Sequence, residues 1–214
     1  MSRLISVSCV GASVTLCACL VGCELAGPAW EPIDNLETGE LALVEGTPDA
    51  TGVLSLVNDP ATTFEILDVD VRLDSRAVES IVRHRAGHDG IYWTEDDNPF
   101  DSLQELDSLY FVGPMAIELL TYWAQARGFV PEGNELLGSF EGVEFSVDEA
   151  DLTLDLVNTA TFERLDETVG VDVRATEAIV AARPLESLAQ LAELYWVGPA
   201  HVELLKSYAL SATD

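Results

Sequence analysis

Cysteine, histidine and positive charge are scarce in this chain. All four cysteines lie within the first 23 residues, and three histidines and a single lysine occur in 214 residues. The 10 basic residues stand against 38 acidic ones, which gives a formal net charge of −28. The shortage of positive charge argues against polyanionic partners. Because no cysteine follows residue 23 and no Ser-His-Asp spacing supports catalysis, we expect no enzyme.

The cysteines that do occur point to an exported protein. Residues 1–22 contain Arg3 followed by apolar residues, which is the layout of a secretory signal peptide. The LVGC at 20–23 resembles the lipobox of bacterial lipoproteins, which implies cleavage before Cys23 and attachment of diacylglycerol to its thiol. The alternative is an ordinary signal peptide with a buried cysteine. Glu24 stands where an inner-membrane retention signal has Asp, so we expect a lipid anchor in the outer membrane.

Two segments of the chain occur twice. Residues 63–82 match 161–180, and residues 102–120 match 187–205, where YFVGPMAIELL aligns with YWVGPAHVELL. A self-match of this kind predicts two copies of one module. Before them, an acidic stretch with proline, glycine and no periodicity predicts a flexible tether. The expected organisation is a signal peptide at 1–22, a tether at 23–46, a module at 47–127 with an insertion at 86–100, a linker at 128–145, and a second module at 146–212.

Each copy has the pattern of short helices. Ser146 and Glu149 match a capping box at a helix start, and apolar residues recur at helical spacing. No stretch alternates as a strand does, so the expected fold is all-α. The apolar stripes are Val78, Ile81 and Val82 on one helix and Ile117, Leu120 and Ala124 on another.

Two turns join the short helices within each copy. In the second turn a glycine followed by proline predicts a tight turn that starts a helix, with glycine supplying unusual backbone angles. Backbone N–H groups at such a turn can hold a phosphate. The first turns are Val71–Asp74 and Val169–Asp172, and the second turns contain Val112, Gly113 and Pro114 in one copy and Val197, Gly198 and Pro199 in the other.

This arrangement resembles the tandem helix-hairpin-helix family, in particular competence proteins that hold DNA at the cell surface. The resemblance covers most of 47–127 and 146–212, including the NTATF lead-in at 158–162. In that family a Gly-hydrophobic-Gly turn places backbone amides against DNA phosphates without reading sequence. The resemblance implies a pair of helix-hairpin-helix motifs in each copy and sequence-independent DNA binding.

The first turns depart from the family's glycines. Arg72 and Gly170 occupy the position of the first glycine, and Asp74 and Asp172 replace the second. An aspartate is a good N-cap that accepts the amides a phosphate would need, and it adds a negative charge. These turns therefore favour a structural hairpin.

The second turns depart from the pattern in another way. Gly113 and Gly198 fall on the second glycine, but Phe111 and Trp196 replace the first. A bulky ring blocks close approach to the backbone or packs the turn into the core. This change again favours a structural hairpin over a phosphate clamp.

Arginines cluster in the first copy and partly recur in the second. They could form a basic face for DNA, or they could pair with carboxylates and cap the C-terminal ends of helices. We favour the second interpretation. The cluster contains Arg72, Arg76, Arg83 and Arg85, and two of these recur as Arg174 and Arg183.

The insertion at 86–100 carries clustered carboxylates. Asp89, Asp96 and Asp97 offer the oxygen ligands that Ca²⁺ takes, so the loop is a candidate calcium site. The alternative is a solvated acidic loop. No other cofactor is expected.

The histidines and the lone lysine are weaker candidates. His84 and His88 stand four residues apart, which suits Zn²⁺ only if both lie on one helix. We expect that helix to end near Arg85, which leaves both as surface residues. His201 is expected on the surface or in the core. Lys206 is the only match to the catalytic lysine of helix-hairpin-helix glycosylases, and nothing else supports that role.

The sequence as a whole predicts a non-catalytic lipoprotein of the cell envelope with two helix-hairpin-helix modules. It would be held at the membrane by its lipid and would act as an interaction or scaffold element for an unidentified protein partner. Sequence-independent DNA binding is the alternative. A continuous basic face over the hairpins would favour DNA, and an acidic face would favour a protein.

Overall fold

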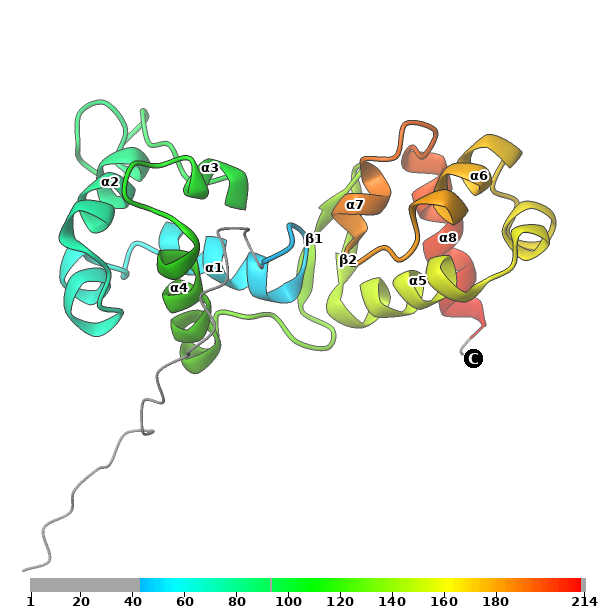
Figure 1. Ribbon diagram of the computed structural model, residues 1–214, viewed down its shortest axis with the longest axis horizontal. Coiled ribbons are helices and arrows are strands. Elements are labelled where there is room, and N and C mark those ends of the chain that lie inside the picture. The colour runs from blue at the N-terminus through cyan, green and yellow to red at the C-terminus, as the bar shows by residue number, and fades with distance from the viewer. Residues whose placement is uncertain (1–42, 93, 213–214) are drawn as a thin grey trace, which may run out of the picture. The chain divides into compact units, whose positions relative to one another are not determined.

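The computed structural model describes residues 43–92 and 94–212, all within one compact unit, Thr38–Asp214. Cys23, the expected signal peptide and most of the expected tether lie outside the described residues. The described chain is mostly helical with one small two-stranded sheet (Figure 1), so the predominantly helical fold is confirmed. None of the described helices is both long and apolar enough to cross a membrane.

Helical elements precede and follow the sheet in the same order. Each set has a helix, a π-helix, a second helix, a five-residue helix and a longer helix. We call residues 47–127 the first half and 146–212 the second half. The first half contains α1 (Pro48–Asn58), η1 (Ile66–Asp70), α2 (Ser75–Arg85), α3 (Leu103–Asp107) and α4 (Pro114–Arg127). The second half contains α5 (Val147–Thr159), η2 (Arg164–Val169), α6 (Val173–Ala182), α7 (Leu188–Ala192) and α8 (Pro199–Ser211).

A β-hairpin lies where the sequence predicted a linker. Strand β1 (Leu136–Phe140) pairs antiparallel with β2 (Val143–Ser146). The chain reverses at Glu141 and Gly142, whose φ angles of 52° and 78° suit a two-residue hairpin turn. Phe145 on β2 is fully buried. The expectation that no stretch forms a strand is wrong here, because strands of four or five residues offer too few alternating positions to be recognised.

Residues next to the turns start the helices where the sequence predicted. Ser146 caps α5: it accepts the Glu149 N–H, and the Glu149 side chain accepts the Ser146 N–H at 2.9 Å. Asp74 and Asp172 are the N-caps of α2 and α6. Helices α4 and α8 both begin at a proline. The predicted capping box, aspartate caps and proline starts are therefore confirmed.

Each half has its own cluster of buried side chains. In the first half α1 packs against α4, and the predicted stripes of α2 and α4 are buried, with Val82 only partly so. In the second half α5 packs against α8, and the hairpin adds Phe145 to the cluster. An asparagine at a matching position in each half links distant parts of the chain. Asn58 forms two hydrogen bonds with the Phe100 backbone, at 2.8 and 2.9 Å, and Asn158 forms the same two bonds with the Leu185 backbone.

The folded body begins before residue 47. Leu43 packs against the first cluster. Glu45 accepts the Leu103 N–H at 2.7 Å at the start of α3, and burial raises its pKa. Gly46 has a φ of 78°, and a Cβ there would lie 2.7 Å from the Ala189 Cβ. The end of the expected tether is thus part of the packed structure.

Candidate functional site: the hairpin turns

The first turn in each half holds one residue in the left-handed region. Arg72 has a φ of 66°, and Gly170 has a φ of 88°. The turn is closed by Leu73, which donates its N–H to the Leu67 carbonyl at 3.0 Å, and the second half has the equivalent bond at the same length. The backbone of the turn is therefore fixed by hydrogen bonds, whatever residue stands at the strained position.

Asp74 accepts a backbone amide at the first turn of the first half. Its Oδ1 accepts the Arg76 N–H at 2.9 Å, and the Arg76 guanidinium donates to both carboxylate oxygens at 2.9 Å. The Arg76 side chain is the main reason why the pKa of Asp74 falls to about 2. An external anion at this turn would have to displace a carboxylate that is already paired.

Asp172 holds a histidine at the equivalent turn of the second half. It accepts the N–H groups of Arg174 and Ala175, at 2.9 and 3.3 Å, and its Oδ2 lies 2.8 Å from His201 Nε2. The Ala175 amide is the main reason why its pKa is lowered. His201 Nδ1 accepts the Gly198 N–H at 3.3 Å. One imidazole thus joins the first turn to the second.

The Asp172–His201 pair is a structural link between the two turns of the second half. Because Nδ1 accepts from the Gly198 amide, Nε2 carries the hydrogen that faces Asp172. Both ring nitrogens are therefore engaged within the fold. His201 was expected to be a surface or core residue, and its hydrogen bonds to two turns could not be read from local sequence.

Gly113 and Gly198 do not supply unusual backbone angles. Their φ angles of −155° and −140° are extended, and a Cβ at either position would meet no atom within 4 Å. The positive φ in the second turn belongs to Phe111, at 70°. The expectation that these glycines provide a special conformation is therefore wrong. They serve as N-caps, each followed by a proline at the first helical position.

Each second turn displays an exposed aromatic pair, which we call an aromatic shelf: Tyr110 with Phe111, and Tyr195 with Trp196. The paired rings meet edge to face, with centroids 4.4 and 4.8 Å apart. Tyr110 is 78% exposed and Tyr195 86%, more than any other large apolar side chain among the described residues. Phe111 and Trp196 are both 46% exposed. The aromatic residues therefore do not pack the turns into the core.

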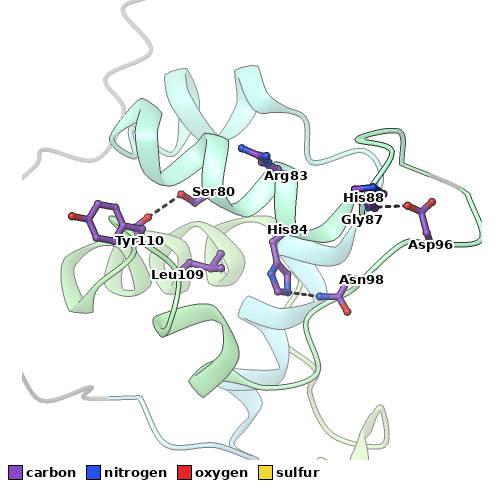
Figure 2. A pocket seen from close by; sticks show the side chains of 9 residues that line it. All are labelled: Ser80, Arg83, His84, Gly87, His88, Asp96, Asn98, Leu109 and Tyr110. Atoms are coloured by element: carbon purple, nitrogen blue, oxygen red, sulfur yellow. Dashed lines mark hydrogen bonds between the residues drawn. The ribbon is translucent and has the colours of Figure 1, made fainter.

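An arginine from α2 or α6 covers each aromatic shelf. The Arg76 guanidinium lies 4.2 Å from the centre of the Phe111 ring, and that of Arg174 lies 4.8 Å from the Trp196 ring. The Ser80 hydroxyl donates to the Tyr110 carbonyl at 2.9 Å (Figure 2). The sequence contained the signal for this contact, since both the arginine and the aromatic pair recur at matching positions.

Two further arginines cap helices from inside the fold. Arg85 is only 4% exposed and donates to three backbone carbonyls at and beyond the end of α1, those of Val57, Asp59 and Thr62. Arg183 donates to a carbonyl near the end of α5. Burial lowers the pKa of both guanidinium groups. The prediction that arginines cap the C-terminal ends of helices is confirmed for these two.

The insertion folds beside the end of α2 and borders a shallow groove of about 580 Å³ (Figure 2). Asp96 organises the loop. It accepts the N–H groups of His88 and Asp89, at 2.7 and 2.9 Å, and the Thr94 hydroxyl at 2.7 Å, and the last of these is the main cause of its lowered pKa. Within residues 43–92 and 94–212, no three side chains of histidine, cysteine, aspartate or glutamate gather where they could hold one metal ion. Calcium binding by Asp89, Asp96 and Asp97 stays a prediction.

The two histidines near the groove do not share a helix. Helix α2 ends at Arg85, as predicted, so His88 lies beyond it. His84 Nε2 lies 3.0 Å from Glu105 Oε1, and the amide of Asn98 lies 2.7 Å from the same nitrogen (Figure 2). His84 therefore links α2 to α3 and to the insertion. Because His88 lies beyond the end of α2, the two histidines do not lie on one helical face, as the predicted alternative of a Zn²⁺ site would require.

Lys206 has a structural role that the sequence did not reveal. Its Nζ donates to the Glu144 carbonyl at 2.7 Å, lies 2.9 Å from Glu149 Oε2, and stands 4.9 Å from the centre of the Phe145 ring. The side chain thus ties α8 to β2 and to α5. Two of these partners, Glu144 and Phe145, lie on β2, a strand that the sequence did not predict.

Comparison of the chain with known protein families, with characterised proteins and with solved structures found no match. The inference of function therefore rests on the residues themselves. They provide two first turns whose amides face internal carboxylates and two second turns that display aromatic shelves.

Proposed function

We propose that this chain is an exported, lipid-anchored protein of the cell envelope whose two helix-hairpin-helix modules, 47–127 and 146–212, bind a partner protein without catalysis. The observation that carries the proposal is the aromatic shelf, present at the same place in both halves. Exposed tyrosine and tryptophan side chains are typical of the central residues of protein interfaces.

The repeat supports a common role for both halves. The order of elements, the matching asparagine, the aspartate cap and the arginine over an aromatic ring each occur twice. A feature that is needed only for folding would also recur. The exposed tyrosines are different, because their side chains contribute little to the core and yet stand at the most accessible point of each turn.

Electrostatics favour a protein over DNA. Affinity for DNA comes from cations that neutralise phosphates, whereas this chain has 10 basic and 38 acidic residues. The amides of the first turns already face Asp74 and Asp172. One feature favours DNA: among the described residues no side chain caps the start of α4 at Gly113.

The test is capture of an envelope partner by the full chain in mild detergent. We expect Tyr110→Ala combined with Tyr195→Ala to abolish specific capture, while Tyr122→Ala leaves it intact. Tyr122 is the matched control, since it is also 57% exposed but lies within α4 away from the turn. In parallel, binding to random-sequence duplex DNA is measured at about 50 and 200 mM salt. DNA binding that weakens steeply with salt and is lost in Arg72→Glu/Arg76→Glu would replace this proposal with the DNA role.

The anchor is tested separately. If Cys23 carries lipid, the wild-type chain stays with membranes in high salt, because each buried CH₂ contributes about 0.8 kcal/mol. Cys23→Ser should leave an unprocessed or soluble form. Release of the wild-type protein by a salt wash would contradict lipidation without touching the role of the aromatic shelves.

A further inference from the structure

We propose that the groove beside the insertion, which only the first half has, binds a partner segment with one acidic side chain, whose carboxylate pairs with Arg83. This inference rests on the proposed function and names the chemistry of the partner at one of the two aromatic shelves. It is carried by the residues that line the groove, by the basic groups among them that are left unbonded, and by the differences between the two halves.

The groove is bounded by α2, by the insertion and by the first aromatic shelf (Figure 2). Its lining includes Arg83 and His84 of α2, His88 and Asn98 of the insertion, and Tyr110 of the shelf. Because Tyr110 is 78% exposed, its ring is available as an apolar wall. A partner that covers this shelf therefore also reaches the polar side chains of α2.

Hydrogen bonds hold the insertion in place. The Asn98 N–H donates to the Arg85 carbonyl at 3.0 Å, so the two ends of the loop lie together. The Tyr92 hydroxyl donates to the Asn58 carbonyl at 2.6 Å, which ties the loop to the end of α1. Compact loops whose ends are close are frequently functional. The groove is thus formed before a partner arrives, which lowers the entropic cost of binding.

Two basic side chains of the groove are free to bind a ligand. The carboxylate of Asp96 already accepts two amides and a hydroxyl, and His84 already faces Glu105. Among the described residues, the side chains of Arg83 and His88 form no hydrogen bond or ion pair. A ligand at this place must therefore supply acceptors. A carboxylate matches the planar guanidinium with two parallel hydrogen bonds.

The second half lacks the polar groups of the groove. In α2 they are Ser80, Arg83 and His84, which correspond to Ala178, Ala181 and Ala182, and the insertion has no counterpart. The second half nevertheless forms the same order of helical elements, so the fold does not require these groups. The tyrosine of the aromatic shelf, in contrast, is present in both halves. The polar groups therefore give the first half a specificity that the second half does not have.

The acidic residues of the chain limit what the groove can take. Asp96 lines the groove, and Glu79, one helical turn before Arg83, lines a neighbouring one together with Arg83. Neither forms an ion pair with Arg83. A nucleic acid, an anionic lipid surface or a second copy of this chain would bring many negative charges against a net charge of −28. The occupant that fits is a segment with one acidic residue among apolar ones.

The experiment is calorimetric titration of the full chain in mild detergent with a capped peptide that has one glutamate between two phenylalanines. The same peptide with glutamine is the control ligand. We expect tighter binding of the glutamate peptide. Arg83→Ala should weaken that binding about tenfold, as the loss of a hydrogen bond to a charged group implies, and should remove the preference for glutamate. This variant copies Ala181 of the second half, so it is expected to fold. Arg72→Ala is the matched control, since it removes another exposed arginine that does not line the groove.

Three outcomes overturn the inference. One is equal affinity of the wild type for the two peptides, and another is equal affinity of wild type and Arg83→Ala for the glutamate peptide. The third is found by titrating inorganic phosphate in parallel: phosphate that binds as tightly as the glutamate peptide would indicate a general anion site. In each case, loss of envelope capture in Tyr110→Ala/Tyr195→Ala would still support the proposed function, so the two failures can be told apart.

Discussion

The residue with a positive φ in each first turn allows a test of backbone strain, in which opposite substitutions are made in the two halves. Arg72 has a φ of 66°, and the matching residue in the second half is Gly170, with a φ of 88°. A non-glycine residue costs about 1–2 kcal/mol in this region, whereas glycine adds about 0.4–1 kcal/mol of unfolded-state entropy. Arg72→Gly should therefore raise the free energy of unfolding by about 0.5–1 kcal/mol, and Gly170→Arg should lower it by a similar amount.

Few other effects interfere with this exchange. Arg72 is exposed and pairs with no described carboxylate, and a Cβ at Gly170 would meet no atom within 4 Å. The assay is thermal unfolding followed by circular dichroism, in which 1 kcal/mol corresponds to about 2–4 °C in Tm for a chain of this size. Gly113→Ser is the control, because its extended φ predicts no strain and a serine N-cap stabilises α4. A less stable Arg72→Gly, or an unaffected Gly170→Arg, would refute the reasoning.

Three further predictions follow from buried and paired groups. Arg85→Met removes the guanidinium donor from the carbonyls of Val57, Asp59 and Thr62, and only that of Asp59 keeps another donor, the Thr62 N–H. Because a buried acceptor left unsatisfied costs about 1–3 kcal/mol, the free energy of unfolding should fall by about 2–5 kcal/mol in urea titration; a loss below 1 kcal/mol would contradict the capping role. The folded-state pKa of Asp74 is about 2, below its usual value of 3.8, so its pair with Arg76 stabilises the fold above about pH 4 and is lost as the pH falls through 2. Carboxyl titration by NMR should show this low pKa and its rise toward 3.8 in Arg76→Ala, and an unchanged pKa in that variant would remove arginine as the cause. Calcium binding by the insertion predicts a higher Tm in millimolar Ca²⁺ that disappears in Asp96→Asn; an unchanged Tm of the wild type would leave the insertion a solvated acidic loop.

Features fixed by a few neighbouring residues could be predicted from the sequence. The capping box at Ser146, the aspartate caps at Asp74 and Asp172 and the end of α2 at Arg85 were all found where expected. The three caps are decided within one helical turn, by hydrogen bonds between a side chain and nearby amides. The apolar stripes were predictable for the same reason, since helical spacing alone puts them on one face.

Features that depend on distant partners could not be predicted. Glycine was expected to hold the unusual angle of the second turn, but in the first half the positive φ belongs to Phe111. His201 and Lys206 looked unremarkable in sequence, and both are ties between elements far apart in the chain. The β-hairpin was not predicted because its strands are short, so the contacts of Lys206 with β2 could not be predicted either.

The placement of the cations supports the proposal of a protein partner over DNA. Among the nine basic residues that the structure describes, Arg85 and Arg183 hold backbone carbonyls inside the fold, and Lys206 holds the hairpin. Four more lie over aromatic rings of the chain itself, and one of these is also paired with a carboxylate. Only Arg72 and Arg83 are left without such a contact. Sequence-independent DNA binding draws on about 6–10 phosphate contacts, whereas two cations within a strongly acidic surface supply far less.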